Sequence, residues 1–562
     1  MTHKADLMAD QAVAPGAPLV GAAVDGLPVG GTISGGTPVR PRRSTVRSGG
    51  RPLLAVAVGA VLLVVTCLLR FDGLTAHLPA LVAVNVDEPT VVTRALGIVH
   101  GRLPTLYDWP TGSMLFLAVP FELVGHLAPS WFQKNPYLVA RYPFAAVSVS
   151  VVLLTGGLAS VMAERRSERM TAAFLASTAV AVSYLCVENG RLILPDQLQL
   201  ALVLAAMICV LFYDHSRSRS WLVAAGILAG LSAGTKYLGG FVILPALGAV
   251  LLESRRGWTR AAVDTALLAV SALVGFVVSV PAVVVHTHDV LVGLHYQFGH
   301  QAGGHLGYDL ASKGWWYYLT QALPGNWGWV LTGFAAAGLV LVAAHGARRQ
   351  RLTLLFVVPV FIALGASKIQ FPHYVILIVP MLAIYAAIAV VWASRHLRRW
   401  GGPLAVLVLA ALLLLSLVPT VVNDMKIVRS ARAPNTQLVA TRVVGRLPGP
   451  VWAEPYTVAV PTRNQIDAAV VGQSPAVLSC RCYVVISSFM EDRYRQQSAK
   501  YGSEVAIYDA VERQGRLVTT IAPGRPLGYD WMELPQYGID TLPLTGPTGL
   551  VGPRITVYKM PG

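Results

Sequence analysis

The sequence predicts a polytopic α-helical membrane protein that ends in a smaller α/β domain. Its 562 residues are 54% hydrophobic and only 13% charged, with a mean hydropathy of +0.58, whereas soluble domains are typically about 25% charged. Long apolar runs recur between residues 52 and 422. Beyond residue 423 the chain changes to short β-rich runs between proline and glycine turns, a pattern typical of a packed α/β domain.

The formal net charge of +16 would suit a protein that binds nucleic acid or one that spans a membrane. The placement of the basic residues separates these classes. Lysine and arginine concentrate in the cytoplasmic loops of membrane proteins, so clusters between apolar runs favour a membrane protein over a nucleic-acid-binding one. The basic clusters lie at 164–169, 215–220, 253–260, 345–351 and 395–400.

Residues 1–51 are rich in Gly, Pro, Ala and Arg, and they predict a disordered cytoplasmic tail. The segment is too long and too weakly apolar for a signal peptide. Its arginines either contact anionic lipid headgroups or are simply solvated, and the sequence leaves both alternatives open.

Eleven apolar runs approach the roughly 20 residues that a transmembrane helix needs. A further run at 112–128 contains Pro120, Glu122 and His126. With the arginine-rich tail inside, all the basic clusters lie in the cytosol only if 112–128 does not cross the membrane. We therefore expect 112–128 to be re-entrant or to lie in the outer interface. The predicted spans are 52–70, 139–163, 170–187, 197–213, 221–235, 237–252, 261–285, 325–344, 352–367, 371–392 and 402–422.

This count divides the chain into a tail at 1–51, a transmembrane domain at 52–422 and an extracytoplasmic α/β domain at 423–562. In the last domain, 435–447 has helical spacing, and the expected strands are VWAEPYTVAV, CYVVISS, LVTTIA and ITVYKM. Of the five cysteines, Cys480 and Cys482 can form a disulfide if this domain is outside the cytosol.

The first outer segment, 71–138, begins its charged part with the adjacent carboxylates Asp87 and Glu88. A carboxylate in an interfacial cleft can act as a general base towards a hydroxyl. The alternative is local, because Asp87 can cap a helix that starts at Glu88 with Pro89 in its first turn. Both functions are compatible at one position.

Cations follow on the same predicted face. Arg191 can clamp a phosphate, and Asp196 lies near it, although a salt bridge or a snorkelling arginine explains both residues equally well. Lys236 and Tyr237 lie in a glycine-rich turn that an anion could approach closely. A second basic and aromatic group contains Lys368, His373 and Tyr374, where His373 is either a phosphate ligand or a structural histidine.

Other polar and aromatic residues on this face are candidates for the acceptor side or for a metal. Trp315 and Trp316 form either an interfacial aromatic belt or a platform for a sugar. His286 and His288 open a histidine-rich loop whose spacing fits no tight metal template. The sequence thus requires no cofactor but leaves a divalent metal open. The remaining acceptor-side candidates are Arg94, Tyr107 and Asp108.

Cations beside a membrane cleft suit a lipid-borne phosphate, and a carboxylate suits deprotonation of a hydroxyl. The residues therefore favour group transfer from a lipid phosphate at the outer leaflet. No GxxxxGK[ST] motif supports an ATPase. The competing class is a transporter or flippase of lipid-linked sugars, for which internal repeats and broken helices at the midplane would be expected.

Three stretches resemble the polyprenyl-phosphate-dependent glycosyltransferases of the GT-C superfamily, and most of all the protein O-mannosyltransferase and aminoarabinose-transferase-like group. They are NVDEPTVVTRALGIVHGRLPTLYDWP, ENGRLILPDQLQL and GLSAGTKYLGGFVILP. The resemblance implies that Asp87 is the catalytic base, that Asp196 and Lys236 belong to the site, and that a late basic residue, Lys368 or His373, binds donor phosphate. It covers roughly residues 52–422.

The resemblance also implies an inverting transfer of a sugar from a polyprenyl-phosphate donor to a hydroxyl of a cell-envelope glycan, a glycolipid or a protein. The placement of the basic clusters puts the N-terminus in the cytoplasm and the site outside, and we expect a bacterial plasma membrane. High Ala, Val, Gly and Arg usage agrees with a GC-rich bacterium. The sugar and the acceptor are not readable from the sequence.

Overall fold

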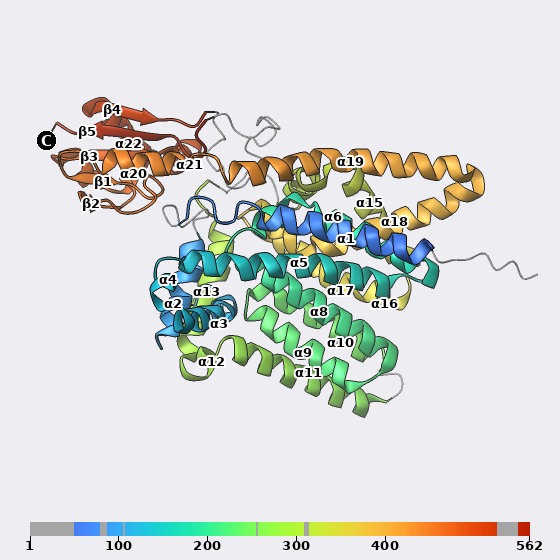
Figure 1. Cartoon of the computed structure of the whole chain (residues 1–562). Helices are drawn as coiled ribbons and strands as arrows, with labels where there is room; N and C mark the ends of the chain where they lie inside the picture. The colour runs from blue at the N-terminus through green and yellow to red at the C-terminus, as the bar shows by residue number, and fades with distance from the viewer. Residues whose placement is uncertain are drawn as a thin grey trace, which may run out of the picture. The chain divides into compact units, whose positions relative to one another are not determined.

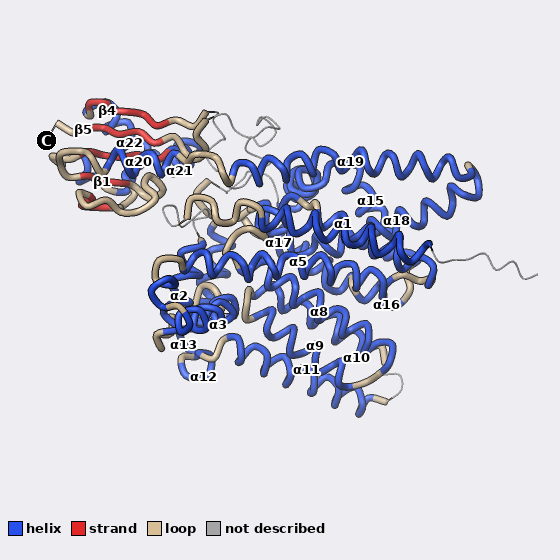
Figure 2. The backbone as a smooth tube through the Cα atoms, viewed as in Figure 1, coloured by secondary structure: helices blue, strands red, loops and turns tan. Residues whose placement is uncertain are grey.

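The computed structural model describes residues 50–78, 87–104, 107–253, 257–307, 314–524 and 549–561. The tail predicted at 1–51 therefore lies almost wholly outside the described residues. Two parts are described below: a large helical part, and a C-terminal part that contains a sheet (Figure 2).

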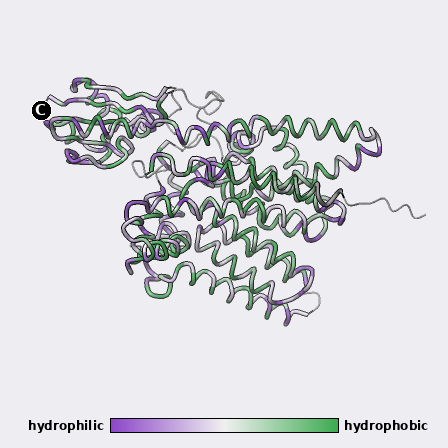
Figure 3. The backbone as a smooth tube through the Cα atoms, viewed as in Figure 1, coloured by the Kyte–Doolittle hydropathy of each residue, from purple (hydrophilic) through white to green (hydrophobic). Residues whose placement is uncertain are grey.

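Every predicted span coincides with a helix in the described chain (Figure 1). Seven helical segments are long and apolar enough to cross a membrane, and others are shorter. Figure 3 shows apolar residues along these helices and polar residues mainly at their ends. The number of eleven crossings remains a prediction. The helices are α1 (Gly50–Phe71), α5 (Pro136–Met162), α6 (Arg169–Ala181), α8 (Pro195–Ser216), α9 (Arg219–Ala233), α10 (Ile243–Leu251), α11 (Trp258–Ser279), α15 (Leu323–His345), α17 (Leu354–Ala366), α18 (Val379–Trp400) and α19 (Gly402–Ser430).

Shorter elements connect these helices. The segment predicted to be re-entrant or interfacial forms α3, which packs against α2 around Val91, Met114 and Phe121. Its position relative to a membrane remains a prediction. The shorter elements are α2 (Glu88–Val99), α3 (Gly112–Leu127), α4 (Pro129–Phe132), η1 (Arg166–Glu168), α7 (Tyr184–Asn189), η2 (Tyr237–Val242), α12 (Ala282–Val285), α13 (Thr287–Gly303), α14 (Gly314–Tyr317), η4 (Tyr318–Ala322), α16 (Arg348–Leu352) and η5 (Pro372–Ile378).

Helix α19 runs eight residues beyond the predicted end of the last span at 422. The sequence prediction stopped where the apolar run stops, at Asn423 and Asp424. The helix continues because Asp424 is fully buried and lies within electrostatic range of the buried Arg70 of α1. A charged residue thus ends an apolar pattern without ending the helix.

The basic clusters meet in space at one end of the helical part. Arg348 forms ion pairs with Asp214 at 3.0 Å and with Glu253 at 2.8 Å. Arg395 lies 3.6 Å from Glu168. These contacts join clusters that are far apart in sequence. They agree with the expectation that the clusters share one side of the membrane.

The C-terminal part contains the expected helix and strands, together with β2. Its five strands have the order β2-β1-β3-β5-β4, in which β1 is parallel to β2 and β3, and β5 is antiparallel to β3 and β4. The elements are α20 (Thr436–Val444), β1 (Val451–Ala453), β2 (Gln465–Asp467), η6 (Val471–Gln473), η7 (Pro475–Ser479), β3 (Tyr483–Ser487), α21 (Ser488–Gln496), α22 (Gly502–Gln514), β4 (Arg516–Ile521) and β5 (Ile555–Lys559).

Both faces of this sheet are covered, so its central strand, β3, is buried throughout. Along β3, Val484 and Ile486 pack in the same cluster as α22, whereas Tyr483 and Val485 pack in the same cluster as α20. This alternation follows from the period of two along a strand. The predicted disulfide between Cys480 and Cys482 is present just before β3.

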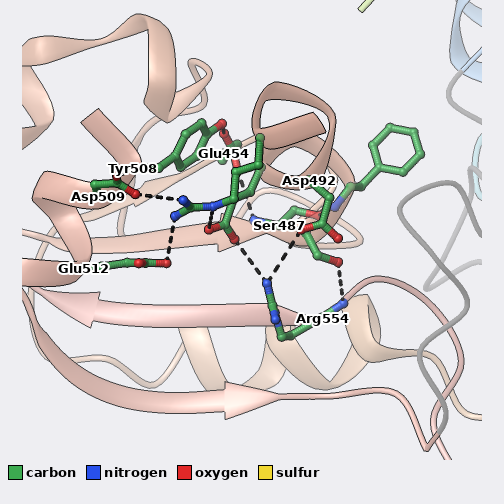
Figure 4. Close-up of polar contacts among 11 residues, drawn as sticks. Glu454, Ser487, Asp492, Tyr508, Asp509, Glu512 and Arg554 are labelled. Carbon is green, nitrogen blue, oxygen red and sulfur yellow. Dashed lines mark hydrogen bonds and ion pairs between the residues drawn. The ribbon is translucent and has the colours of Figure 1, made fainter. Parts of the chain in front are cut away.

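Directly after β1, Glu454 is 1% exposed and accepts three hydrogen bonds (Figure 4). Its donors are the backbone N–H of Val471 at 3.1 Å, the backbone N–H of Ser487 at 3.0 Å and the hydroxyl of Tyr508. Glu454 therefore ties β1 to the end of β3 and to α22. Burial raises the pKa of Glu454 to about 7, although the three donors oppose this shift.

Candidate active site

Asp87 stands at the start of α2, where a general base was predicted. It occupies the N-cap position, with Pro89 in the first turn, but its side chain makes no capping hydrogen bond. The carboxylate is only half-buried. The helix start therefore fixes the backbone of Asp87 without using its side chain as a cap.

Glu88, the neighbouring residue, is fully buried. Its carboxylate accepts a hydrogen bond from the backbone N–H of Ile193 at 3.1 Å and lies 3.4 Å from the guanidinium of Arg141 on α5. Arg141 also donates to the carbonyl of Leu74 at 2.9 Å. Glu88 therefore anchors the start of α2 to two other elements, an arrangement suited to positioning Asp87.

Lys236 and Asp196 form an ion pair between two helix ends. The Lys236 Nζ lies 2.7 Å from Asp196 Oδ1, and Gln199 donates to the Lys236 carbonyl at 2.8 Å. Asp196 lies in the first turn of α8, where the helix dipole favours a negative charge. Lys236 lies in extended backbone between α9 and η2. The lysine side chain is 24% exposed, so an anion can still reach it.

The rings of η5 border this ion pair. The Lys236 Nζ lies 5.1 Å from the ring centroid of Tyr374, within the range of a cation–π contact. The His373 ring is 4.9 Å from that of Tyr374, and His373 interacts electrostatically with Asp196. The Asp87 carboxylate also acts on Lys236, more weakly than Asp196 does. Five predicted residues thus converge from α2, α8, the Lys236 turn and η5.

Close backbone packing joins the Lys236 turn to the segment before α3. The N–H of Gly112 donates to the carbonyl of Gly234 at 2.8 Å, and a Cβ on Gly112 would lie 2.6 Å from that carbonyl oxygen. The hydroxyl of Tyr237 donates to the carbonyl of Tyr107 at 3.1 Å. The hydrogen bond between Tyr237 and Tyr107 therefore joins these two segments beside the site. The absence of a side chain at Gly112 permits the close contact with Gly234.

Arg191 belongs to a different group of charges. It is 7% exposed and donates to the carbonyls of Leu69 at 2.8 Å and Asp72 at 2.5 Å. No contact in the described chain joins its side chain to Lys236 or Asp196. Arg191 thus fastens the end of α1 through backbone carbonyls, which is neither the salt bridge nor the snorkelling arrangement considered for it.

The remaining predicted residues lie in separate contacts. Arg94 and Asp108, both in the segment predicted to be the first outer one, form an ion pair at 2.7 Å. Lys368 is exposed, and its backbone N–H donates to the carbonyl of Gln301 at 3.0 Å. The Trp315 ring packs closely against Gly365, and Trp316 is 64% exposed.

The histidine-rich loop is largely helical, with His286 capping α13. His286 Nδ1 lies 3.8 Å from Asp289 Oδ2, and both side chains are about half exposed. His288 is also exposed. Within the described residues, no group of three or more His, Cys, Asp or Glu side chains has the arrangement of a metal site.

Tyr456 of the C-terminal part was not among the predicted residues. It follows β1 with a positive φ of 68°, and its ring contacts Phe489 with 4.6 Å between centroids. Burial raises the pKa of Tyr456, Arg493 opposes the shift, and the Asp87 carboxylate adds to it. Tyr456 thus lies within electrostatic range of Asp87. No local sequence signal marks such a tyrosine, because the contact depends on the tertiary fold.

Comparisons with known proteins show what this chain is similar to. Residues 107–288 match the family model of dolichyl-phosphate-mannose-protein mannosyltransferase, which covers Tyr107, Arg191, Asp196 and Lys236. No curated protein shows significant sequence similarity to the chain.

Solved structures share the fold at low sequence identity. The archaeal oligosaccharyltransferase AglB from Archaeoglobus fulgidus, in complex with an inhibitory peptide and a dolichol-phosphate, superposes with a TM-score of 0.55 at 13% identity, over 85% of this chain and 74% of AglB. ArnT from Cupriavidus metallidurans, bound to undecaprenyl phosphate, superposes with a TM-score of 0.50 at 15% identity, over 91% of this chain and 98% of ArnT.

These findings confirm the resemblance drawn from the sequence. The protein has the fold of the GT-C superfamily of polyprenyl-phosphate-dependent glycosyltransferases. Within that superfamily, its segment 107–288 is similar to the protein O-mannosyltransferase family.

Proposed function

We propose that the protein is an inverting glycosyltransferase that moves a sugar from a polyprenyl-phosphate donor to a hydroxyl acceptor on the extracytoplasmic face of a bacterial plasma membrane. The observation that carries this proposal is the convergence of Asp87, the Lys236–Asp196 ion pair and His373 at one end of the apolar helices. A base and a phosphate-binding cation are the two groups that this transfer needs.

In the proposed reaction, Asp87 takes the proton of the acceptor hydroxyl, and that oxygen attacks the anomeric carbon of the sugar. The bond between the anomeric carbon and the phosphate oxygen breaks, and polyprenyl phosphate leaves with the bonding electrons. Lys236 is placed to balance the charge that develops on the leaving phosphate, and Asp196 and Tyr374 hold its ammonium group. A divalent metal remains possible and is not required by these steps.

The charge distribution supports the proposed sidedness. Helix α5 runs from one end of the helical part to the other. Arg141, near the start of α5, contacts Glu88 beside the candidate site, whereas Met162 ends the helix next to the basic cluster at 164–169. The ion pairs that join the basic clusters therefore lie at the end opposite Lys236. Clusters of this kind are typical of cytoplasmic loops. The Cys480–Cys482 disulfide also agrees with an extracytoplasmic C-terminal domain.

Tyr456 suggests how the C-terminal domain takes part. The Asp87 carboxylate acts electrostatically on Tyr456, which supports a role for this aromatic ring where a sugar or a peptide acceptor would approach. We assign it to the acceptor side, and its proposed acceptor is a cell-envelope glycan, a glycolipid or a protein.

The test is transfer of a labelled sugar from a panel of polyprenyl-phosphoryl sugars into membranes that contain the full-length protein. Asp87→Asn is expected to lower transfer by about 10²- to 10⁴-fold, the usual contribution of a general base. Glu122→Gln is the matched control, because Glu122 is exposed on α3 in the same outer segment. Full activity of a folded Asp87→Asn protein would refute the proposal.

The same membranes distinguish the competing function. A flippase would move the lipid-linked sugar across the bilayer without transferring it, and Asp87→Asn and wild type would then give equal, background levels of labelled product. Protection of the donor from an impermeant oxidant measures that movement.

A further inference from the structure

A cavity of about 280 Å³ opens at the basic end of the helical part, far along the helices from Asp87. It is lined by the connection between α5 and α6, the end of α15, Gln350 of α16 and the last turns of α18. Neither the proposed transfer nor any predicted site residue uses it.

Basic side chains dominate the polar part of this cavity. Arg165, Arg395 and Arg399 line it together with two histidines, His345 and His396. An anion that enters would therefore find an excess of positive charge.

Two carboxylates also line the cavity, Glu164 and Glu168. Glu168 lies 3.6 Å from Arg395 and 3.9 Å from Arg165, so it compensates part of their charge. Arg399 forms no ion pair in the part of the chain that the structure describes. The buried Nε of Arg395 has no hydrogen-bond acceptor, since 3.6 Å is beyond hydrogen-bonding distance. The cavity thus offers one unpaired guanidinium and one unused donor.

The other part of the lining is apolar. Leu341 and Val342 of α15 and Ile388 and Val391 of α18 form this part. Trp392 lies beside them, 41% exposed and stacked near the His396 ring with 4.0 Å between centroids. Tryptophan is enriched at the level of lipid headgroups. A soluble phosphate would leave this apolar wall unused, whereas a lipid would cover it.

We propose that this cavity binds the phosphate headgroup of an anionic phospholipid, with Arg165, Arg395 and Arg399 around the phosphate and an acyl chain along the wall of α15 and α18. Basic pockets between transmembrane helices are known to take anionic headgroups in this way. The bound lipid would join α5, α15 and α18. Helix α18 follows η5, which carries His373 and Tyr374, so the lipid stabilises the helix that supports the candidate active site.

The experiment measures phosphatidylglycerol binding to the full-length protein by native mass spectrometry after purification in a zwitterionic detergent. The double variant Arg165→Gln/Arg399→Gln is expected to weaken binding by about thirty-fold, the combined effect of two arginines near an anionic lipid. The matched control is Arg351→Gln, at the same end of the molecule, where the guanidinium donates to the Ala344 carbonyl at 3.3 Å and does not line the cavity.

A second variant separates the lipid site from general electrostatic attraction. Val391→Trp keeps every charge but fills the apolar wall, so it is expected to exclude phosphatidylglycerol. Unchanged binding in both cavity variants would overturn the proposal. Equal binding of phosphatidylcholine would overturn the role of the arginines, and competition by glycerol 3-phosphate at the same concentration as the lipid would assign the site to a soluble phosphate.

Discussion

The stability of the C-terminal domain is expected to fall as pH rises, because of one buried carboxyl group. The unfolded chain ionises Glu454 near its ordinary pKa of 4.5, whereas the folded chain holds the pKa at about 7. Below the unfolded pKa both states are protonated and the stabilisation is complete. Between the two values only the unfolded state loses its proton, so the free energy of unfolding decreases and the contribution is gone above about pH 7.

The difference between the two pKa values gives the magnitude. The rise from 4.5 to about 7 corresponds to about 3 kcal/mol, at about 1.4 kcal/mol for each pKa unit. This is a large part of the stability of a small domain. Burial raises the pKa of Asp492, and burial with nearby carboxylates raises that of Glu512, so both groups act in the same direction.

Hydrogen exchange in the full-length protein measures this effect at the two amides that donate to Glu454, those of Val471 and Ser487. After correction for the intrinsic exchange rate, their protection is expected to fall between about pH 4.5 and about pH 7. Glu454→Gln should remove most of this pH dependence and leave the part that comes from Asp492 and Glu512. The substitution should also lower the free energy of unfolding by about 1–3 kcal/mol at acidic pH, because the glutamine NH₂ group leaves one of the three donors without an acceptor.

The control is Glu504→Gln. Glu504 lies on the same helix as Tyr508, and its carboxylate accepts a surface hydrogen bond from Ser503. It should keep the wild-type pH profile. Protection of Val471 and Ser487 that rises with pH, or a Glu454→Gln profile parallel to wild type, would refute the reasoning.

Three further predictions concern the candidate active site. Lys236→Met should lower sugar transfer by about 10²- to 10³-fold in the same assay, because it removes a fixed charge beside the developing anion. The control is Lys134→Met, an exposed lysine whose loss should leave wild-type activity. Equal activity of the two variants would remove Lys236 from the mechanism. Glu88→Ala should lower stability by about 3–5 kcal/mol in thermal unfolding because it leaves Arg141 buried without its carboxylate, and an unchanged melting temperature would contradict the anchoring role. Gly112→Ala should lower the free energy of unfolding by about 1–3 kcal/mol, because the added Cβ would collide with the Gly234 carbonyl. Gly101→Ser is the comparison: an added Cβ there has no neighbour within 4 Å, so this variant tests only the strain of a φ of 71°.

The helical fold was predictable because its signals are local. An apolar run of sufficient length marks each helix, and arginines between the runs mark the shared end. The strands were predictable for the same reason, since Tyr483–Ser487 contains three consecutive β-branched residues, Val484, Val485 and Ile486. The end of α19 was not predictable, because only its tertiary contacts show that Asp424 is buried near Arg70.

The candidate site was predictable as a set of residues and not as a set of pairs. Charges in an apolar chain are rare, so Asp87, Asp196 and Lys236 stood out from the sequence. Their partners could not be assigned, because Lys236 and Asp196 are 40 positions apart and Glu88 and Arg141 are 53 apart. Arg191 seemed equivalent to Lys236 by residue type, yet the fold directs it to carbonyls at the end of α1.

The pairing of charges differs between the two ends of the helical part, and this difference bears on function. At the basic end, Asp214 and Glu253 each contact two arginines, Arg217 and Arg348, so both carboxylates join separate helices. At the site end, Lys236 is held directly by Asp196 and acts on Asp87 at longer range. Burying an ion pair is costly unless its geometry is fixed. Asp196 provides that fixed geometry for the Lys236 ammonium group, which also lies within electrostatic range of Asp87. A half-buried carboxylate at the start of a helix, within range of a positioned cation, is the arrangement that we propose for the general base.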